Sequence, residues 1–259
     1  MPTPVAHRVL SRRYRVPASR FAVTTKDGVT LSGARLGGGD GPSLVFCHGF
    51  LGWHRKASLV RFQEELARPF TVYAVDFRGH GQSGGLSTFG ALEYLDVEAV
   101  ASFARAEGAE RVVTLGGSMG GIAVLRHAAL VGGIDGVVAI STPALWDGHD
   151  SAAIRRMAWL TGTARGRAML RAAGTRVSPD WRKTEAPADL VQDIAPVPLV
   201  LVHGRDDHYF DEEQAWLLYR RAREPKRLLL FDRFGHAEDG YTPRVAAEIT
   251  RVVLEMVPA

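Results

Sequence analysis

Cysteine is almost absent from this sequence. Cys47 is the single cysteine in 259 residues, so the chain has no partner for an internal disulfide. Proteins of reducing compartments do without such bonds, whereas small secreted proteins depend on them. Cys47 lies in the apolar run "SLVFCHG", which predicts a small buried side chain at the end of a strand rather than a reactive thiol.

Long apolar runs are absent as well. No run approaches the roughly 18 apolar residues of a membrane-spanning helix. The N-terminal stretch "MPTPVAHRVLSRRYRVP" is basic, but the apolar core of a secretory signal does not follow it. We therefore expect a cytoplasmic protein without an integral membrane segment.

A strong excess of one charge is also missing. The 32 basic and 28 acidic residues give a formal net charge of +4, which permits an anionic partner but does not require one. We expect no nucleic-acid partner, and the sequence carries no signal for an oligomeric state. An apolar content of 46% and a charged content of 23% are ordinary for a globular protein, and the length suffices for one large domain.

Strand and helix signals alternate along most of the chain. Residues 20–36 read as a hairpin with a turn at Lys26-Asp27-Gly28. Continuous apolar runs predict strands at 43–47, 70–76, 111–116, 134–142, 196–204 and 226–232, and helical spacing predicts helices at 55–68, 91–108, 119–133, 211–223 and 242–256. This alternation predicts an α/β fold, a mostly parallel sheet flanked by helices.

The alternation stops at residues 143–187, which are rich in arginine, tryptophan and methionine. We expect a small helical cap here, inserted after the strand at 134–142, with residues 1–142 and 188–259 as the core. The aromatic residues form either an acyl pocket or the cap's own small core. From Arg155 to Lys183 there are eight basic residues and one acidic residue, Asp180. This imbalance is either a solvated face or a surface that attracts an anionic substrate.

Ser118 lies between a predicted strand and a predicted helix, in "LGGSMGG" (115–121). The sequence G-x-S-x-G in this setting is typical of a nucleophile held in a tight, strained turn. Glycines avoid collisions with the strand and the helix, and the first amides of the helix point at any negative charge beside the serine.

A serine hydroxyl is a weak nucleophile, so it needs a base that a third group orients. Asp206 and Asp207 follow the strand at 196–204, and His236 follows the next strand. The carboxyl ends of parallel strands form the ligand-binding edge of such a sheet. The order serine, acid, histidine is that of a hydrolase triad, with either aspartate as the acid.

An oxyanion hole is the remaining part of such a site. The short loop in "FCHGFLG" (46–52) follows an early strand and can present the amide of Phe50. The amide of Met119 is the second expected donor. Loss of one such donor typically costs about 3–4 kcal/mol of transition-state stabilisation.

Over nearly its whole length the chain resembles the α/β-hydrolase superfamily. The matching motifs are "HGF" (48–50), "DFRGHGQS" (76–83), "GGSMGG" (116–121), "HGRDD" (203–207) and "GH" (235–236). Of these, "DFRGHGQS" with "GGSMGG" looks most like the branch of carboxylesterases, lysophospholipases and monoacylglycerol lipases. The resemblance implies an α/β-hydrolase fold and a triad of Ser118, His236 and Asp207, with Phe50 and Met119 as oxyanion donors. The family usually continues from the acid with x-x-Val-Pro, whereas residues 208–211 read "HYFD", so Asp206 is the alternative acid.

These observations predict a serine hydrolase that acts on a small-molecule ester or thioester. The same triad could serve a carbon–carbon bond hydrolase, a perhydrolase or an acyltransferase, and a non-catalytic ligand-binding protein is the alternative from another class. No cofactor is expected, and no metal, because the other histidines have no companions at the spacing of metal ligands. His48, His80 and His203 are expected in structural turns, and Asp76 is expected to hold the turn that follows it.

Overall fold

A single sheet of eight strands organises the part of the chain that the structure, a computed structural model, describes: residues 10–148 and 151–257. Residues 149–150 of the expected cap and residues 1–9 and 258–259 of the expected core lie outside it. The strands are β1 (Ala18–Thr24), β2 (Thr30–Gly37), β3 (Ser43–Cys47), β4 (Thr71–Asp76), β5 (Val112–Gly117), β6 (Gly136–Ile140), β7 (Leu199–Gly204) and β8 (Lys226–Phe231).

The strands lie in the order β1-β2-β4-β3-β5-β6-β7-β8. β1, β2 and β4 pair antiparallel, and every pair from β4 to β8 is parallel. The chain runs from β3 to β4 on one side and then returns to β5 on the other. Such a reversal opens a crevice at the carboxyl ends of the central strands. The mostly parallel sheet predicted from the sequence is confirmed.

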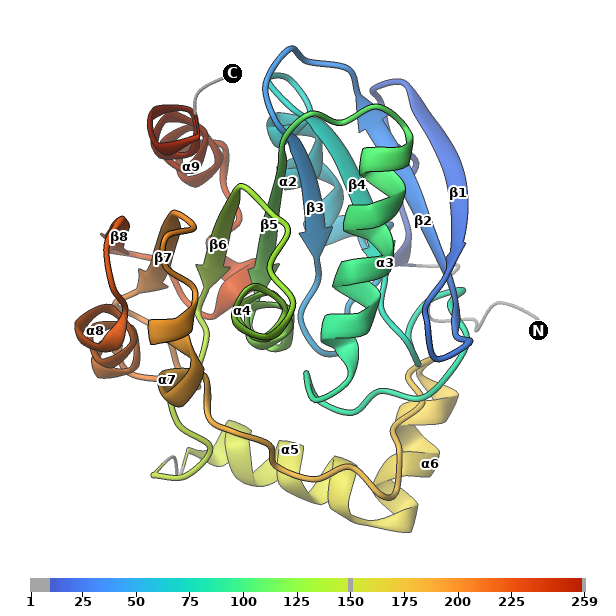
Figure 1. Ribbon diagram of the computed structural model, residues 1–259. Helices are drawn as coiled ribbons and strands as arrows, with labels where there is room; N and C mark the ends of the chain where they lie inside the picture. The colour runs from blue at the N-terminus through green and yellow to red at the C-terminus, as the bar shows by residue number, and fades with distance from the viewer. Residues whose placement is uncertain (1–9, 149–150, 258–259) are drawn as a thin grey trace.

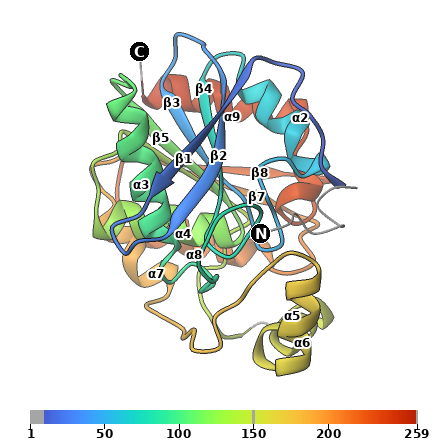
Figure 2. The same ribbon diagram turned by 90° about the vertical axis from the view of Figure 1, so that its right-hand side faces the viewer.

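Helices cover both faces of the sheet (Figure 1). They are α2 (Ala57–Leu66), α3 (Glu93–Ala106), α4 (Met119–Leu130), α7 (Pro187–Leu190), α8 (Glu212–Arg221) and α9 (Pro243–Met256), with short 3-10 turns η1 (Val191–Asp193) and η2 (Ala237–Gly240). Figures 1 and 2 show α2 and α9 on the opposite side of the sheet from α3 and α4. Strands buried from both sides need continuous apolar runs, and every residue of β3, "SLVFC", is buried.

Two expected strands are several residues shorter in the structure, for local reasons. The strand expected at 134–142 ends at Ile140, because Ser141 has a φ of +47° and turns the chain. The strand expected at 196–204 begins at Leu199. Pro196 and Pro198 precede it, and proline has no N–H to donate to a sheet.

The expected cap segment contains two helices, α5 (Ala152–Gly162) and α6 (Ala164–Ala172). They lie beyond the carboxyl ends of the parallel strands (Figures 1 and 2). Side-chain oxygens cap both helices: Ser151 accepts from the Ile154 amide at 3.2 Å, and Thr163 from the Gly166 amide at 3.0 Å. That residues 143–187 act as a cap stays a prediction.

The longest described helices, α3 and α9, have 14 residues each. A bilayer-spanning helix needs about 20 apolar residues. Within residues 10–148 and 151–257, no helix is both long and apolar enough to cross a membrane.

Candidate active site

Ser118 stands at the junction of β5 and α4, as predicted. Its backbone has φ +54° and ψ −117°, a conformation that residues other than glycine rarely adopt. The Ser118 amide donates to the Ile140 carbonyl at 2.8 Å, which ties the turn to the end of β6. The hydroxyl is thereby held at the carboxyl edge of the sheet, where strain is tolerated because the surroundings determine the conformation.

Close backbone packing explains the glycines on both sides of Ser118. A Cβ at Gly116 would overlap the carbonyl of Gly120, and a Cβ at Gly120 would overlap the carbonyl of Cys47. Any side chain at these positions would push α4 away from β5 or β3. The motif is therefore a steric requirement of this strand–turn–helix.

Three predicted side chains from distant parts of the sequence make successive hydrogen-bonding contacts. The Ser118 Oγ is 2.8 Å from the His236 Nε2, and the His236 Nδ1 is 2.8 Å from the Asp207 Oδ2. β5, β7 and β8 each end near this point, and the loops that follow β7 and β8 carry Asp207 and His236. The arrangement lets Nδ1–H donate to the carboxylate while Nε2 accepts from the serine hydroxyl.

Asp207, and not Asp206, is the aspartate that meets His236. The Asp207 side chain is fully buried, and its Oδ1 also accepts from the amides of Tyr209 at 2.8 Å and Phe210 at 3.1 Å. Burial alone would raise the pKa of Asp207, but His236 and the two amides outweigh it and lower the pKa below the usual range. Asp206 is exposed.

Aromatic rings surround His236, a feature that the sequence analysis missed. The ring of Tyr209 lies 4.4 Å from the His236 ring, and that of Phe210 lies 5.5 Å away. The His236 amide donates to the Asp239 carboxylate at 3.2 Å, which fixes the backbone at the start of η2. The departure "HYFD" after Asp207 was the available signal, because it places two aromatic residues where the family pattern has x-x-Val-Pro.

The two predicted oxyanion donors, Phe50 and Met119, both line the cavity that contains Ser118 and His236. The Met119 amide is the first of α4, and such amides have no partner within their own helix. Within the described ranges, neither this amide nor that of Phe50 donates to a backbone carbonyl of another segment. The oxyanion role of these amides stays a prediction.

Asp76 holds the turn that follows it, as predicted, and it also anchors the segment after Phe50. Its Oδ1 accepts from the His54 amide and contacts the His54 Nδ1, both at 2.7 Å, and its Oδ2 accepts from the Gln82 amide at 2.8 Å. Burial of this carboxyl opposes ionisation, but the charge and hydrogen bond of His54 outweigh it and lower the pKa of Asp76 to about 2.

Acid should therefore remove part of the stability that Asp76 contributes. A folded pKa below the ordinary 3.8 means that the contribution is present above about pH 4 and is lost as the pH falls toward 2. The shift is worth about 2 kcal/mol. We expect Asp76→Asn to lower the free energy of unfolding at pH 7 by at least about 2 kcal/mol, and by about 1 kcal/mol less at pH 3. Urea titrations at both pH values measure this, with Asp232→Asn at an exposed site as control. A difference that grows in acid would contradict it.

His48 and His203 make structural contacts, as predicted, but His203 lies within strand β7 and not in a turn. The His48 Nε2 accepts from the Phe77 amide at 3.1 Å, while its Nδ1 contacts the Gly49 carbonyl at 2.7 Å. Burial lowers the pKa of His48 to about 3, so the ring is neutral. His203 contacts the Phe210 carbonyl at 3.1 Å. Among the described residues, no three His, Cys, Asp or Glu side chains converge as metal ligands would.

The cavity beside Ser118 has a volume of about 610 Å³. Its two lysines are paired with carboxylates, Lys56 with Glu238 at 2.7 Å and Lys183 with Asp147, and Asp239 is a further acidic lining residue. None of the arginines between residues 155 and 182 lines it. Its apolar lining consists of Phe50, Leu51, Phe89, Met119, Ile122, Pro143, Leu145, Trp146, Ile154, Met157, Ala158, Trp181, Tyr209, Phe210 and Ala237.

The sequence is similar to a family model and to proteins of two bacteria. A family model described as "Alpha/beta hydrolase family" matches residues 44–251. The uncharacterized protein YfhR of Escherichia coli O157:H7 is 28% identical, over 82% of this chain and 71% of that protein. The uncharacterized protein YqkD of Bacillus subtilis is 26% identical, over 89% and 77%.

Solved structures share the fold. The Pyrococcus furiosus esterase Pf2001 has a TM-score of 0.72 and 23% identity, covering 93% of this chain and 92% of that one. The esterase RhEst1 from Rhodococcus sp. ECU1013 has a TM-score of 0.73 and 20% identity, covering 92% and 99%.

Proposed function

Because the chain belongs to the alpha/beta hydrolase family, we propose that it is a serine hydrolase that cleaves a carboxylic ester or thioester. The observation that carries this proposal is the line of hydrogen-bonding distances from Ser118 Oγ through His236 to Asp207, at 2.8 Å for each step. The line ends in an apolar cavity, which suits a small organic substrate. Two of the structural neighbours are esterases by name.

The chemistry follows from the atoms that face one another. Ser118 Oγ attacks the carbonyl carbon while His236 Nε2 takes its proton. The carbonyl oxygen becomes an oxyanion, which the amides of Phe50 and Met119 stabilise by about 3–4 kcal/mol each. The intermediate collapses when His236 returns the proton to the departing alcohol or thiol, which leaves an acyl-enzyme on Ser118.

A water molecule hydrolyses the acyl-enzyme and so releases the acyl group as an acid. His236 Nε2 takes a proton from that water, whose oxygen attacks the acyl carbon, and the proton then passes to Ser118 Oγ as the acid departs. Asp207 stays ionised throughout, because its lowered pKa favours the carboxylate. It holds the Nδ1–H tautomer of His236 and stabilises the imidazolium.

We further propose that residues 143–187 form a cap over this site and that the substrate is uncharged. The cavity is lined by residues of this segment, including Trp146, Met157 and Trp181. The lysines that line it are paired with carboxylates, so they offer little attraction to an anion. The arginines of the segment do not line the cavity, and Arg167 donates to the Thr161 carbonyl at 3.0 Å.

Salt should therefore have little effect on turnover. We expect kcat/KM for a neutral ester to change by less than about twofold between about 0.01 and 0.5 M salt, since screening acts on attraction between charges. Replacing Arg165, Arg167 and Arg171 with glutamine should leave kcat/KM at low salt similarly unaffected. The opposite result would be a preferred anionic substrate, such as a coenzyme A thioester, whose kcat/KM falls with salt and with the triple substitution. That result would assign the basic segment to substrate attraction.

Covalent labelling tests the proposal directly. A fluorophosphonate should label Ser118 in the native protein and not in heat-unfolded protein, because only the folded site activates the hydroxyl. A panel of p-nitrophenyl esters and matched thioesters then measures which acyl bond is cleaved. Absence of labelling would instead favour a non-catalytic binding protein.

A further inference from the structure

Phe89 has an unusual backbone for a large side chain. Its φ is +58°, in the left-handed region that bulky residues avoid. Phe89 lies in the loop between β4 and α3, is half-buried, and lines the cavity beside Ser118. Strained residues of this kind persist only where the surroundings determine the conformation, and they concentrate at ligand-binding sites.

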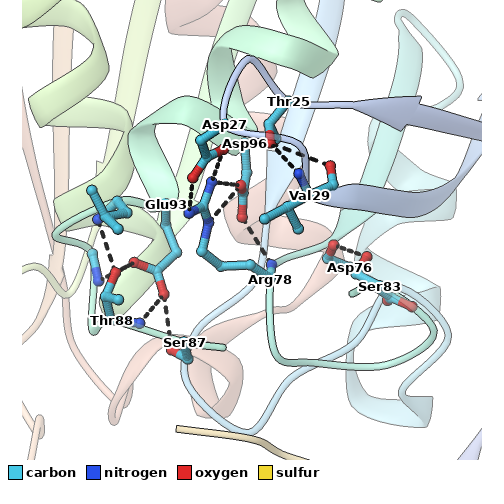
Figure 3. Close-up of polar contacts among 12 residues, drawn as sticks. Thr25, Asp27, Val29, Asp76, Arg78, Ser83, Ser87, Thr88, Glu93 and Asp96 are labelled. Carbon is cyan, nitrogen blue, oxygen red and sulfur yellow. Dashed lines mark hydrogen bonds and ion pairs between the residues drawn. The ribbon is translucent and has the colours of Figure 1, made fainter. Parts of the chain in front are cut away.

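Glu93, at the start of α3, holds this loop in place (Figure 3). Its buried carboxylate accepts four hydrogen bonds from the residues around Phe89. They come from the hydroxyls of Ser87 at 2.8 Å and Thr88 at 2.7 Å, and from the amides of Thr88 and Gly90 at 2.8 Å each. A buried carboxylate is stabilised only when its lone pairs are satisfied. Glu93 therefore fixes the backbone on both sides of Phe89.

The Phe89 ring joins two parts of the site. Its centroid lies 4.3 Å from that of Phe50 and 5.2 Å from that of Trp181. Phe50 belongs to the expected oxyanion loop, and Trp181 to the segment after α6. The same loop is tied to that segment by backbone bonds of Ser87 to Arg176 at 2.8 Å and to Ser178 at 2.9 Å. The three rings thus form a continuous aromatic wall of the cavity.

We propose that Phe89 is a specificity-determining residue and that Glu93 is its positioning residue. The wall of Phe50, Phe89 and Trp181 offers apolar area without hydrogen-bonding groups on its ring faces, so it selects esters with a hydrocarbon chain or ring over short acetyl esters. This inference rests on the proposed hydrolase function and names the substrate class of that site.

A chain-length series measures the effect of Phe89. The probes are p-nitrophenyl esters from acetate to octanoate, with ethyl and octyl acetate to distinguish an acyl from an alcohol chain. We expect Phe89→Ala to lower kcat/KM for the long member of one series about tenfold, mainly through KM, because each methylene leaving apolar contact costs about fourfold in binding. In the same variant, kcat/KM for p-nitrophenyl acetate should change by less than about twofold. Leu92→Ala, at an exposed position nearby, is the control and should change kcat/KM for neither the long ester nor the acetate.

A double-mutant cycle separates positioning by Glu93 from a general structural role. Glu93→Gln places an amide donor against loop donors, so we expect the same selective loss for the long substrate. Because Glu93 acts through Phe89, the double variant should lose no more than Phe89→Ala alone. Full additivity, or equal loss on acetate and octanoate, would overturn the positioning role. If Glu93→Gln does not fold, Glu93→Asp replaces it, and a cycle in which that variant changes nothing also overturns the role.

Failure of the Phe89 inference can be distinguished from failure of the proposed function. Wild-type protein that is labelled by a fluorophosphonate but shows no preference for longer chains, or a Phe89→Ala variant that keeps that preference, would overturn this inference alone. Wild-type protein that is neither labelled nor active on any ester would overturn the proposed function itself.

Discussion

Ser118→Ala is expected to abolish ester turnover, lowering kcat on the order of 10⁶-fold, the scale known for a serine hydrolase that loses its nucleophile. The Ser118 Oγ is the oxygen within 2.8 Å of His236 Nε2, and alanine offers no atom that could form the acyl-enzyme. Stability should hardly change, because alanine can keep the same backbone at φ +54° and Ser118 is only half-buried. Initial rates on p-nitrophenyl butyrate and thermal unfolding measure the two effects.

The matched control for this substitution is Ser102→Ala. Ser102 is exposed on α3, where its hydroxyl donates to Glu98 at 2.9 Å, and its loss should leave turnover unchanged. A purified Ser118→Ala protein with activity near that of the wild type would remove the triad from the mechanism. If Ser118→Ala is inactive but also unfolded, Ser118→Cys takes its place. Cysteine keeps a nucleophile at this position and should retain labelling by a thiol-reactive ester.

Asp207→Asn is expected to lower kcat about 10⁴-fold, as the equivalent change does in a serine protease. Asp207 Oδ1 accepts from the amides of Tyr209 and Phe210, so the oxygen of the new side chain will occupy that place. Its NH₂ group then faces His236 Nδ1, where Oδ2 lay at 2.8 Å. A donor there forces the proton onto Nε2, and this tautomer cannot accept the proton of Ser118.

Asp206→Asn provides the comparison, because the two residues are adjacent and differ in where they point. Asp206 is exposed, and its amide donates to the Phe234 carbonyl at 3.1 Å, a backbone contact that the substitution keeps. We expect kcat within about threefold of the wild type, as for most exposed substitutions. If Asp206→Asn proved to be the more damaging change, the acid would have to be reassigned by one residue.

Local sequence signals were sufficient to predict the succession of strands and helices along the chain and the segment that carries the nucleophile. Apolar runs between turn residues mark β3, β5 and β7 because strands buried on both faces cannot carry polar residues. Gly116 and Gly120 mark the turn at Ser118 because backbone atoms of β3 and α4 leave no space for a Cβ. Such constraints act within a few residues, so they can be read from a pattern.

Other parts of the site depend on contacts that no local pattern encodes. The aromatic wall of Phe50, Phe89 and Trp181 was not predicted. In "STFGALE", nothing about a phenylalanine before a glycine indicates its φ or the side chains that it contacts. Glu93 is an acidic residue within the expected helix at 91–108, and nothing in its local sequence marks its partners. Its function as a fourfold acceptor depends on the fold of the loop that precedes it.

By itself, the sequence determined the α/β class, the position of the serine in its strained turn, and the order of serine, acid and base along the chain. Only the tertiary structure decided that Asp207 rather than Asp206 contacts His236, that the arginines of residues 155–182 lie off the cavity, and that Phe50, Phe89 and Trp181 form one wall. The physical reason is separation along the chain. Ser118 and His236 are 118 positions apart, and which atoms meet over such a distance is set by strand pairing and packing, not by the residues next to them.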